Sequence, residues 1–420
     1  MSTASGRLPR TVIALSLVSL LTDVSSEMIY PLIPTFLATT LGASALGVGA
    51  IEGTAESVAS LLKFGSGWWS DRLRRRKPLV VVGYLLASVV RPLIGVAQVA
   101  GHVFAIRIID RIGKGIRTAP RDALLADAVE PARRGAAFGF HRAADHLGAV
   151  TGPLLAFALM AWGGVSLRVV FLLAAIPAAL AMVVLIGMVR EDDRAVPAAG
   201  APPGDDGGAA GGSVAGSAGG TFDGAAGVAA GGEARLGGRF TAYLAVLLLF
   251  TLGNSTDAFL LLRARSLGVA TAMLPVLWSA LHVVKALSST PAGALSDRVG
   301  RRGLIVAGWL VYAATYVGFA VAEGAWSAWL LFLAYGIYFG LTEGVEKALV
   351  ADLVPAAARG RAFGLYNLAI GVGALPASLL FGAVWDARGA PTAFLLGATL
   401  AAVAAVLLPL VIPRALPVRA

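Results

Sequence analysis

The sequence predicts an all-α polytopic membrane protein, with twelve transmembrane helices in two six-helix pseudo-repeats. Of the 420 residues, 57% are hydrophobic and only 14% are charged, against about 25% charged in a typical soluble domain. Apolar runs of about 20 residues recur along the chain, and each is long enough to cross a hydrocarbon layer about 30 Å thick. Because lipid offers no partners for backbone groups, these runs must span as helices rather than as open strands.

A repeated motif relates the two halves of the chain. The motif is a glycine, an aspartate four positions later and an arginine directly after it, at the end of an apolar segment. Its two copies are Gly67, Asp71 and Arg72, and Gly293, Asp297 and Arg298. Internal duplication of this kind is frequent in membrane transporters.

Six apolar segments precede a low-complexity stretch and six follow it. The first six are expected at 11–40, 44–70, 78–98, 101–123, 136–161 and 167–189. The other six are expected at 240–264, 271–295, 303–322, 326–350, 361–385 and 390–412. Residues 195–238 are rich in Gly and Ala and bury too little surface to fold, which predicts a disordered cytoplasmic linker. The units are therefore two helical bundles, 1–194 and 239–420, joined by this linker.

The net charge of +10 is better explained by membrane topology than by binding to nucleic acid. Lys and Arg concentrate in alternate connections, for example 72–77 and 298–302, whereas the connections near 41–47 and 323–327 carry almost none. The positive-inside rule then places both termini in the cytoplasm, and we expect the cytoplasmic membrane of a bacterium. The sequence has no cysteine, which excludes disulfides and Cys-ligated metal sites.

Charged side chains inside the apolar segments are the main functional signal. Each costs about 2.5–3.5 kcal/mol on insertion scales, so it should face a partner or a water-filled space. Asp23 and Glu27 are four residues apart, on one face of the first span. Desolvation at that depth favours a neutral carboxyl, and a nearby arginine favours the ionised one, which is the balance that proton uptake and release require. The candidates for proton coupling are Asp23, Glu27, Glu52, Glu56, Arg111 and Asp145. The alternative is a buried ion-pair network that only holds helices together.

Several motifs resemble those of major facilitator superfamily transporters, over all of the chain except the tails and the linker. The repeated motif resembles the signature loop between helices 2 and 3 of that family. Arg111 and Lys114 are similar to a helix 4 pattern associated with proton coupling, with Lys114 in place of glutamine. Gly148, Gly152 and Pro153 match the start of a helix 5 signature typical of antiporters, although the small pair that normally follows is incomplete.

This resemblance implies that helices 1, 4, 7 and 10 line a central cavity, where the acidic face of helix 1 meets the basic face of helix 4. We expect Arg111 to be the arginine closest to Asp23 and Glu27. The substrate-cavity candidates are Arg107, Lys114, Asn254, Asp257, Tyr335, Tyr338 and Glu343.

The repeated motif is also a candidate conformational latch. Asp71 and Asp297 lie where the N-terminus of a neighbouring helix could present unpaired amides and a partial positive charge. Each aspartate could therefore hold one side of the molecule shut in one state and release it in the other. The alternative is that the arginines beside them only fix the topology.

We therefore expect a secondary transporter that exports a small organic solute in exchange for protons by alternating access. The first alternative is proton-coupled uptake of an organic anion, favoured by the basic helix 4. The second is a non-transporting membrane sensor on the same scaffold. The expected partners are the lipid bilayer, a small-molecule substrate and protons, with one copy of the chain acting alone. We expect no enzymatic activity, no cofactor, no metal site and no nucleic acid.

Overall fold

The computed structural model describes residues 8–70, 75–129, 134–191, 237–355 and 358–412, and all of its regular elements in these ranges are helices. The first six spans form the N half. They are α1 (Arg10–Ile29) continued by η1 (Tyr30–Leu32), α2 (Ile33–Thr35) and η2 (Phe36–Thr40); α3 (Ala45–Ser70); α4 (Lys77–Val90) with η3 (Arg91–Val96); α5 (Ala100–Asp127); α6 (Arg134–Ala161); and α7 (Leu167–Leu173) with α8 (Ala175–Met188).

The remaining six spans form the C half, and the twelve-helix prediction is confirmed. They are α9 (Gly238–Gly253) with α10 (Ala258–Ser266); η5 (Thr271–Met273) with α11 (Leu274–Val299); α12 (Arg301–Val321); α13 (Ala325–Leu353); α14 (Arg359–Arg388); and α15 (Ala390–Val411). The predicted linker, 195–238, lies almost entirely outside the described residues.

Local sequence explains where individual spans bend or end. Pro31 and Pro34 have no N–H to donate, and the first span changes from an α-helix to other helical forms beside them. In the seventh span the helix is interrupted at Asn254–Asp257, between α9 and α10. Gly300, in the second copy of the repeated motif, has φ +89°, a value that favours glycine, and the chain turns there from α11 into α12.

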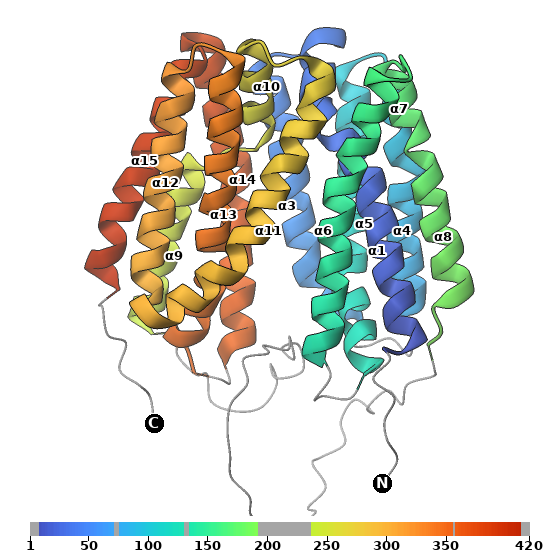
Figure 1. The fold of residues 1–420 in the computed structure, drawn as a ribbon. Helices are drawn as coiled ribbons and strands as arrows, with labels where there is room; N and C mark the ends of the chain where they lie inside the picture. Colours follow the sequence, from blue (N-terminus) through green and yellow to red (C-terminus); the bar gives the residue numbers. More distant parts are fainter. Residues whose placement is uncertain (1–7, 71–74, 130–133, 192–236, 356–357, 413–420) are drawn as a thin grey trace, which may run out of the picture.

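The two halves lie side by side and meet at one end of the molecule. Figure 1 shows them converging at the end away from the termini, here called the far end, and diverging toward the end where α1 begins and α15 ends, here called the termini end. The contact is made by two helix pairs, α3 with α14 and α6 with α11. Each pair joins the second span of one half to the fifth span of the other.

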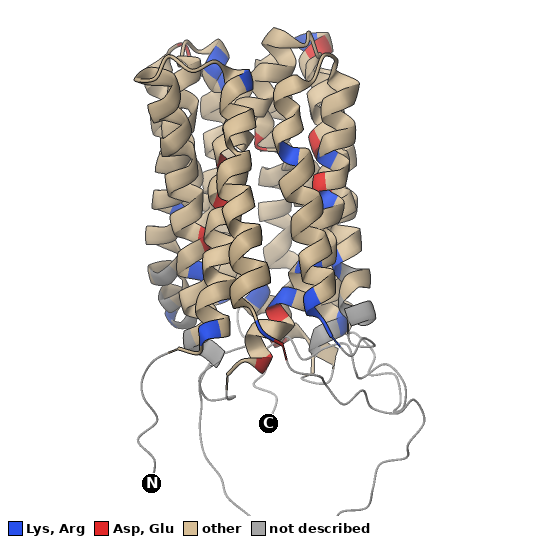
Figure 2. Ribbon diagram, turned by 90° about the vertical axis from the view of Figure 1, so that its right-hand side faces the viewer, with Lys and Arg blue, Asp and Glu red and all other residues tan. Residues whose placement is uncertain are grey.

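The outer surface suits a lipid environment. Large apolar side chains such as Val183 and Leu410 are exposed, and ten of the described spans are long and apolar enough to cross a membrane. The two spans that fall short are α3 and α5, which carry most of the charged side chains at depth. Figure 2 shows charged residues at both ends of the bundle, with more Lys and Arg toward the termini end, and a few acidic and basic residues midway.

Apolar packing differs between the halves. In the N half the buried side chains form two separate clusters, one around Val18 and Tyr84 and the other around Met28 and Phe171. In the C half they form one continuous cluster that is rich in aromatic rings. The interval between the two N-half clusters holds the charged groups described below.

Candidate functional site

A network of buried ion pairs joins α3, η3 and α5 in the N half. The Arg107 guanidinium binds the Glu52 carboxylate through two hydrogen bonds, one of them Nε–Oε1 at 2.8 Å. Arg91 donates to Asp110 Oδ1 at 3.2 and 2.8 Å, and Arg107 Nη1 lies 3.6 Å from Asp110 Oδ2. All four residues are at most 5% exposed. The acidic stripe of the second span and the basic face of the fourth therefore contact one another directly.

A second charged group lies one turn closer to the termini end. Glu56 is exposed on α3, and the cations that act on it most strongly are Arg111 and Lys114 of α5, followed by Lys63. Arg111 Nε is buried and has no hydrogen-bond partner among the described residues. The structure thus sets Arg111 opposite Glu56, whereas the sequence led us to expect it opposite Asp23 and Glu27.

Asp23 lies where α1 crosses α6. The charges acting on it are the carboxylates of Asp145 and Glu27 and the cations Lys114 and Arg121. Asp145 is held only loosely, with His141 Nε2 at 3.7 Å and Arg142 Nη1 at 3.8 Å. Two carboxylates that repel each other, Asp23 of α1 and Asp145 of α6, therefore lie at this crossing, and the cations that act on Asp23 come from α5.

The helix 5 glycines make this close crossing possible. A Cβ on Gly148 would lie 2.8 Å from the Asp23 Cβ, and one on Gly152 would lie 2.6 Å from the Val24 carbonyl oxygen. Pro153 follows within α6. The two glycines of the antiporter-like motif thus form the seam against the helix that carries Asp23 and Glu27.

Glu27 makes a contact between the halves. Trp278 Nε1, on α11, donates a hydrogen bond to Glu27 Oε2 at 2.8 Å. The Tyr30 ring lies beside the same indole, 5.1 Å between centroids. The next residue of α11, Ser279, donates through its Oγ to the Val150 carbonyl of α6 at 3.0 Å. Glu27 is therefore part of the junction that keeps the halves together.

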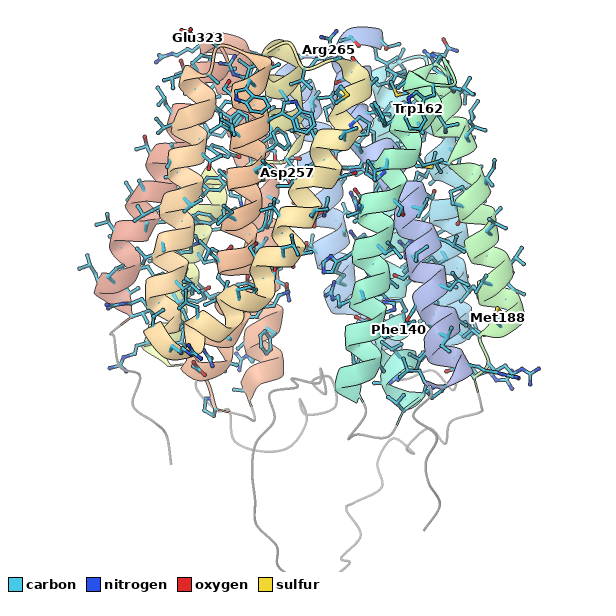
Figure 3. All side chains as sticks on the ribbon, in the orientation of Figure 1. Phe140, Trp162, Met188, Asp257, Arg265 and Glu323 are labelled. Carbon is cyan, nitrogen blue, oxygen red and sulfur yellow. The ribbon has the colours of Figure 1, made fainter. Side chains whose placement is uncertain are left out.

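The interruption of the seventh span brings polar groups to the middle of the C half. Tyr335 OH donates to Asp257 Oδ1 at 2.7 Å, and Asn254 Nδ2 donates to Tyr338 OH at 3.3 Å. The negative charges of Glu56 and Glu27, which belong to the other half, also act on the Asp257 carboxylate. Figure 3 shows it at depth in the bundle, well below Arg265 and Glu323 at the far end. Four of the predicted substrate-cavity residues are thus brought together.

Two further carboxylates lie on α13. Glu343 pairs with Lys285 of α11 at 2.8 Å. Glu346 is 6% exposed and accepts hydrogen bonds from Trp309 Nε1 and Tyr366 OH, each at 2.9 Å. Glu343 was predicted as a substrate-cavity residue, whereas Glu346 was not.

The latch residues are only partly described. Asp71 and Arg72 lie outside the described residues, as does the side chain of Asp297, and Gly67 is described only as part of α3. The backbone of Gly293 and the exposed Arg298 belong to the last turns of α11. The role of this motif therefore stays a prediction.

Residues with clear partners that escaped the sequence analysis include Trp278, Glu346 and Asp386. The rule that charges at depth are functional would have selected Glu346, which lies three residues after Glu343. Asp386 accepts backbone hydrogen bonds from Ala45 and Leu46 in the other half. No pattern within one helix signals a partner in the opposite half, so Trp278 and Asp386 had no local signature.

Comparison with known proteins gives consistent matches along the whole chain. The family model described as Major Facilitator Superfamily matches residues 15–280 and 243–420. An uncharacterized MFS-type transporter of Methanocaldococcus jannaschii is 32% identical over 407 residues, 96% of this chain and 94% of that protein. The multidrug resistance protein MdtH of Cronobacter sakazakii is 34% identical over only 115 residues, 27% of this chain and 29% of that protein. Among solved structures, a bacterial homolog to the human lysosomal transporter Spinster, inward-facing and occupied, has a TM-score of 0.73 at 15% identity, covering 95% of this chain and 96% of that one.

Proposed function

The chain belongs to the major facilitator superfamily and is a transmembrane transporter, and from this premise we propose that it exports a small organic solute in exchange for protons by alternating access. The solute would bind between the halves, near Asp257, Tyr335 and Tyr338. Protons moving down their gradient would then drive the solute out.

The contact between Glu27 and Trp278 is the observation that carries this proposal. Its 2.8 Å hydrogen bond crosses between the halves in a state whose far end is closed. Opening of the far end must break it, because the two residues belong to different halves. A change in the protonation of Glu27 therefore changes the strength of a bond that distinguishes the two states, which is what coupling demands.

The surroundings of Glu27 support a proton pathway along α1. Asp23 lies one turn away and is repelled by both Glu27 and Asp145. The negative charges of Glu27 and Asp145 act against that of Asp23. Lys114 and Arg121 attract Asp23 from α5 and offer the opposing force needed for release.

Two observations support export and its orientation. The match that covers 115 residues of the chain is to a protein described as a multidrug resistance protein. In addition, Gly148, Gly152 and Pro153 follow the antiporter-like pattern. The concentration of Lys and Arg toward the termini end (Figure 2) supports termini in the cytoplasm, in a bacterial cytoplasmic membrane. The state described here would then be open toward the cytoplasm.

A second candidate is proton-coupled uptake of an organic anion. It is favoured by Lys63, Arg111 and Lys114, the three cations that act most strongly on Glu56, of which Lys114 also acts on Asp23. Three cations facing two carboxylates leave an excess of positive charge that a substrate carboxylate or sulfonate would neutralise.

Flux in proteoliposomes separates these candidates. Vesicles containing the purified protein and a pH-sensitive dye are loaded with members of a panel of organic cations, neutral solutes and anions, and are then diluted. Exchange predicts that solute exit acidifies the lumen, because protons enter. Symport predicts alkalinisation, because protons leave with the solute. Solute movement without any pH change would contradict proton coupling, and no movement of any solute would favour the sensor.

A further inference from the structure

Helices α3 and α14 form the longest seam between the halves. Glycines let their backbones approach closely: a Cβ on Gly382 would lie 2.7 Å from the Leu46 Cα, and one on Gly53 would lie 3.1 Å from the Leu375 Cα. Toward the termini end, Ser57 Oγ donates to the Gly371 carbonyl at 2.6 Å. This seam has to separate whenever the far end opens.

One carboxylate closes the seam at the far end. Asp386 is one turn after Gly382 on α14, and its Oδ1 and Oδ2 accept hydrogen bonds from the backbone N–H groups of Ala45 and Leu46 at 2.9 and 2.8 Å. These two amides are the first of α3. A negative charge therefore lies at the N-terminus of a helix, where the helix dipole attracts it.

The first backbone amides of α3 need hydrogen-bond acceptors from outside the helix. The first N–H groups of a helix have no partner within the helix. Ser44 supplies its hydroxyl to the Gly47 N–H at 3.1 Å, as an N-terminal cap usually does. The Ala45 and Leu46 amides are left to Asp386, about 340 residues away in the other half. A cap supplied by the opposite half exists only while the far end is closed.

We propose that Asp386 is a positioning residue for transport, which holds the far end closed by capping α3 and releases it when the far end opens. Because Asp386 is exposed, water replaces the carboxylate on opening, so the bond favours one state without trapping it. The inference rests on the alternating access of the proposed function, but it requires neither a particular substrate nor proton coupling.

Distances between spin labels test the proposal directly, and the absence of native cysteine allows labels at chosen sites. One pair, Trp162→Cys directly after α6 and Trp326→Cys at the start of α13, reports on the far end, where both side chains are exposed. A second pair, Met188→Cys with Leu410→Cys, reports on the termini end. Double electron–electron resonance is recorded in nanodiscs at one pH, without substrate, for the parent and for Asp386→Asn, Asp386→Ala and Asp386→Glu.

Asp386→Asn should lengthen the far-end distances and shorten the termini-end distances. The ratio of the two states should change about tenfold, equivalent to about 1.4 kcal/mol. Asp386→Ala should shift it further because no acceptor remains, and Asp386→Glu should restore much of the parent distribution. Glu323→Gln is the matched control, because it removes an exposed far-end carboxylate for which the described part of the chain offers no partner in the other half, and it should change nothing.

Unchanged distances in both Asp386→Asn and Asp386→Ala, in folded protein, would overturn the proposal and leave Asp386 as an ordinary surface acid. An equal shift in Glu323→Gln would overturn it too, since general far-end charge would then be the cause. Failure of proton-driven flux in the parent would contradict the proposed function, yet would leave these distance shifts as they are.

Discussion

In the N half, the buried carboxylates of Glu52 and Asp110 are bound by guanidinium groups, whereas in the C half the half-buried Asp257 and the buried Glu346 are bound by phenol and indole groups. The first arrangement neutralises each charge with a fixed opposite charge. The second gives each carboxylate neutral hydrogen-bond donors in place of a bound cation. The two halves thus share one helix arrangement but provide different partners for these carboxylates.

Core packing follows the same division. A charged layer separates two apolar clusters in the N half, while a single aromatic cluster fills the C half, with Phe250 stacked on Trp309 at 4.5 Å. A buried ion pair resists rearrangement, because separating the two side chains leaves each charge buried without its partner. We infer that the N half is the fixed scaffold for Glu27 and Asp23, and that the C half offers the more adaptable substrate surface.

The largest expected effect is on the N-half pairs. Arg107→Ala leaves Glu52 buried without its cation and should destabilise the protein by about 3–5 kcal/mol, measured as thermal unfolding in detergent. Adding Glu52→Gln should recover a large part of that loss. Arg265→Ala, an exposed far-end change, should stay within about 0.5 kcal/mol. A mild effect of Arg107→Ala would mean that these pairs do not hold the scaffold.

A smaller effect is expected in the C half. Glu346→Gln keeps one oxygen for two donors, so either Trp309 or Tyr366 loses its acceptor, at a cost of about 1–3 kcal/mol. The same unfolding assay applies, with Glu323→Gln as the exposed control. If Glu346→Gln cost as much as Arg107→Ala, the proposed difference between the halves would disappear.

The two copies of the latch motif extend the comparison to kinetics. Asp71→Asn keeps the size of the side chain and removes its charge, which should slow turnover roughly tenfold, as expected for losing about 1.4 kcal/mol from one state. Asp297→Asn should slow it less. Exchange rates at saturating substrate in proteoliposomes measure both. Normal turnover in Asp71→Asn would reduce the motif to a topology signal.

Sequence reasoning predicted the number of spans, their order and the charges at depth, because apolar length and i, i+4 spacing are properties of single helices. Gly148 and Gly152 were selected from a helix 5 pattern, and the structure places both against α1. Pairing between helices was harder to predict. Arg107 meets Glu52 and Arg111 faces Glu56 because of how α3 and α5 rotate against each other, which spacing within one helix does not specify.

Contacts between the halves were not predictable at all. Trp278 reaches Glu27, and Asp386 reaches α3, across the two halves in a state whose far end is closed. A sequence encodes both states of a transporter at once, so no pattern along the chain indicates which partners meet in either one.

Proton coupling through Glu27 is the central claim, and one comparison of two transport modes tests it most directly. Glu27→Gln keeps an acceptor for the Trp278 indole but cannot exchange a proton. In the same vesicles, it should retain substrate counterflow and lose accumulation driven by a pH gradient. Asp23→Asn should show a weaker version of this split, and Arg111→Ala should impair both modes. Full proton-driven accumulation by both Glu27→Gln and Asp23→Asn would contradict the account and move the coupling site to Glu52, Glu56 or Asp145.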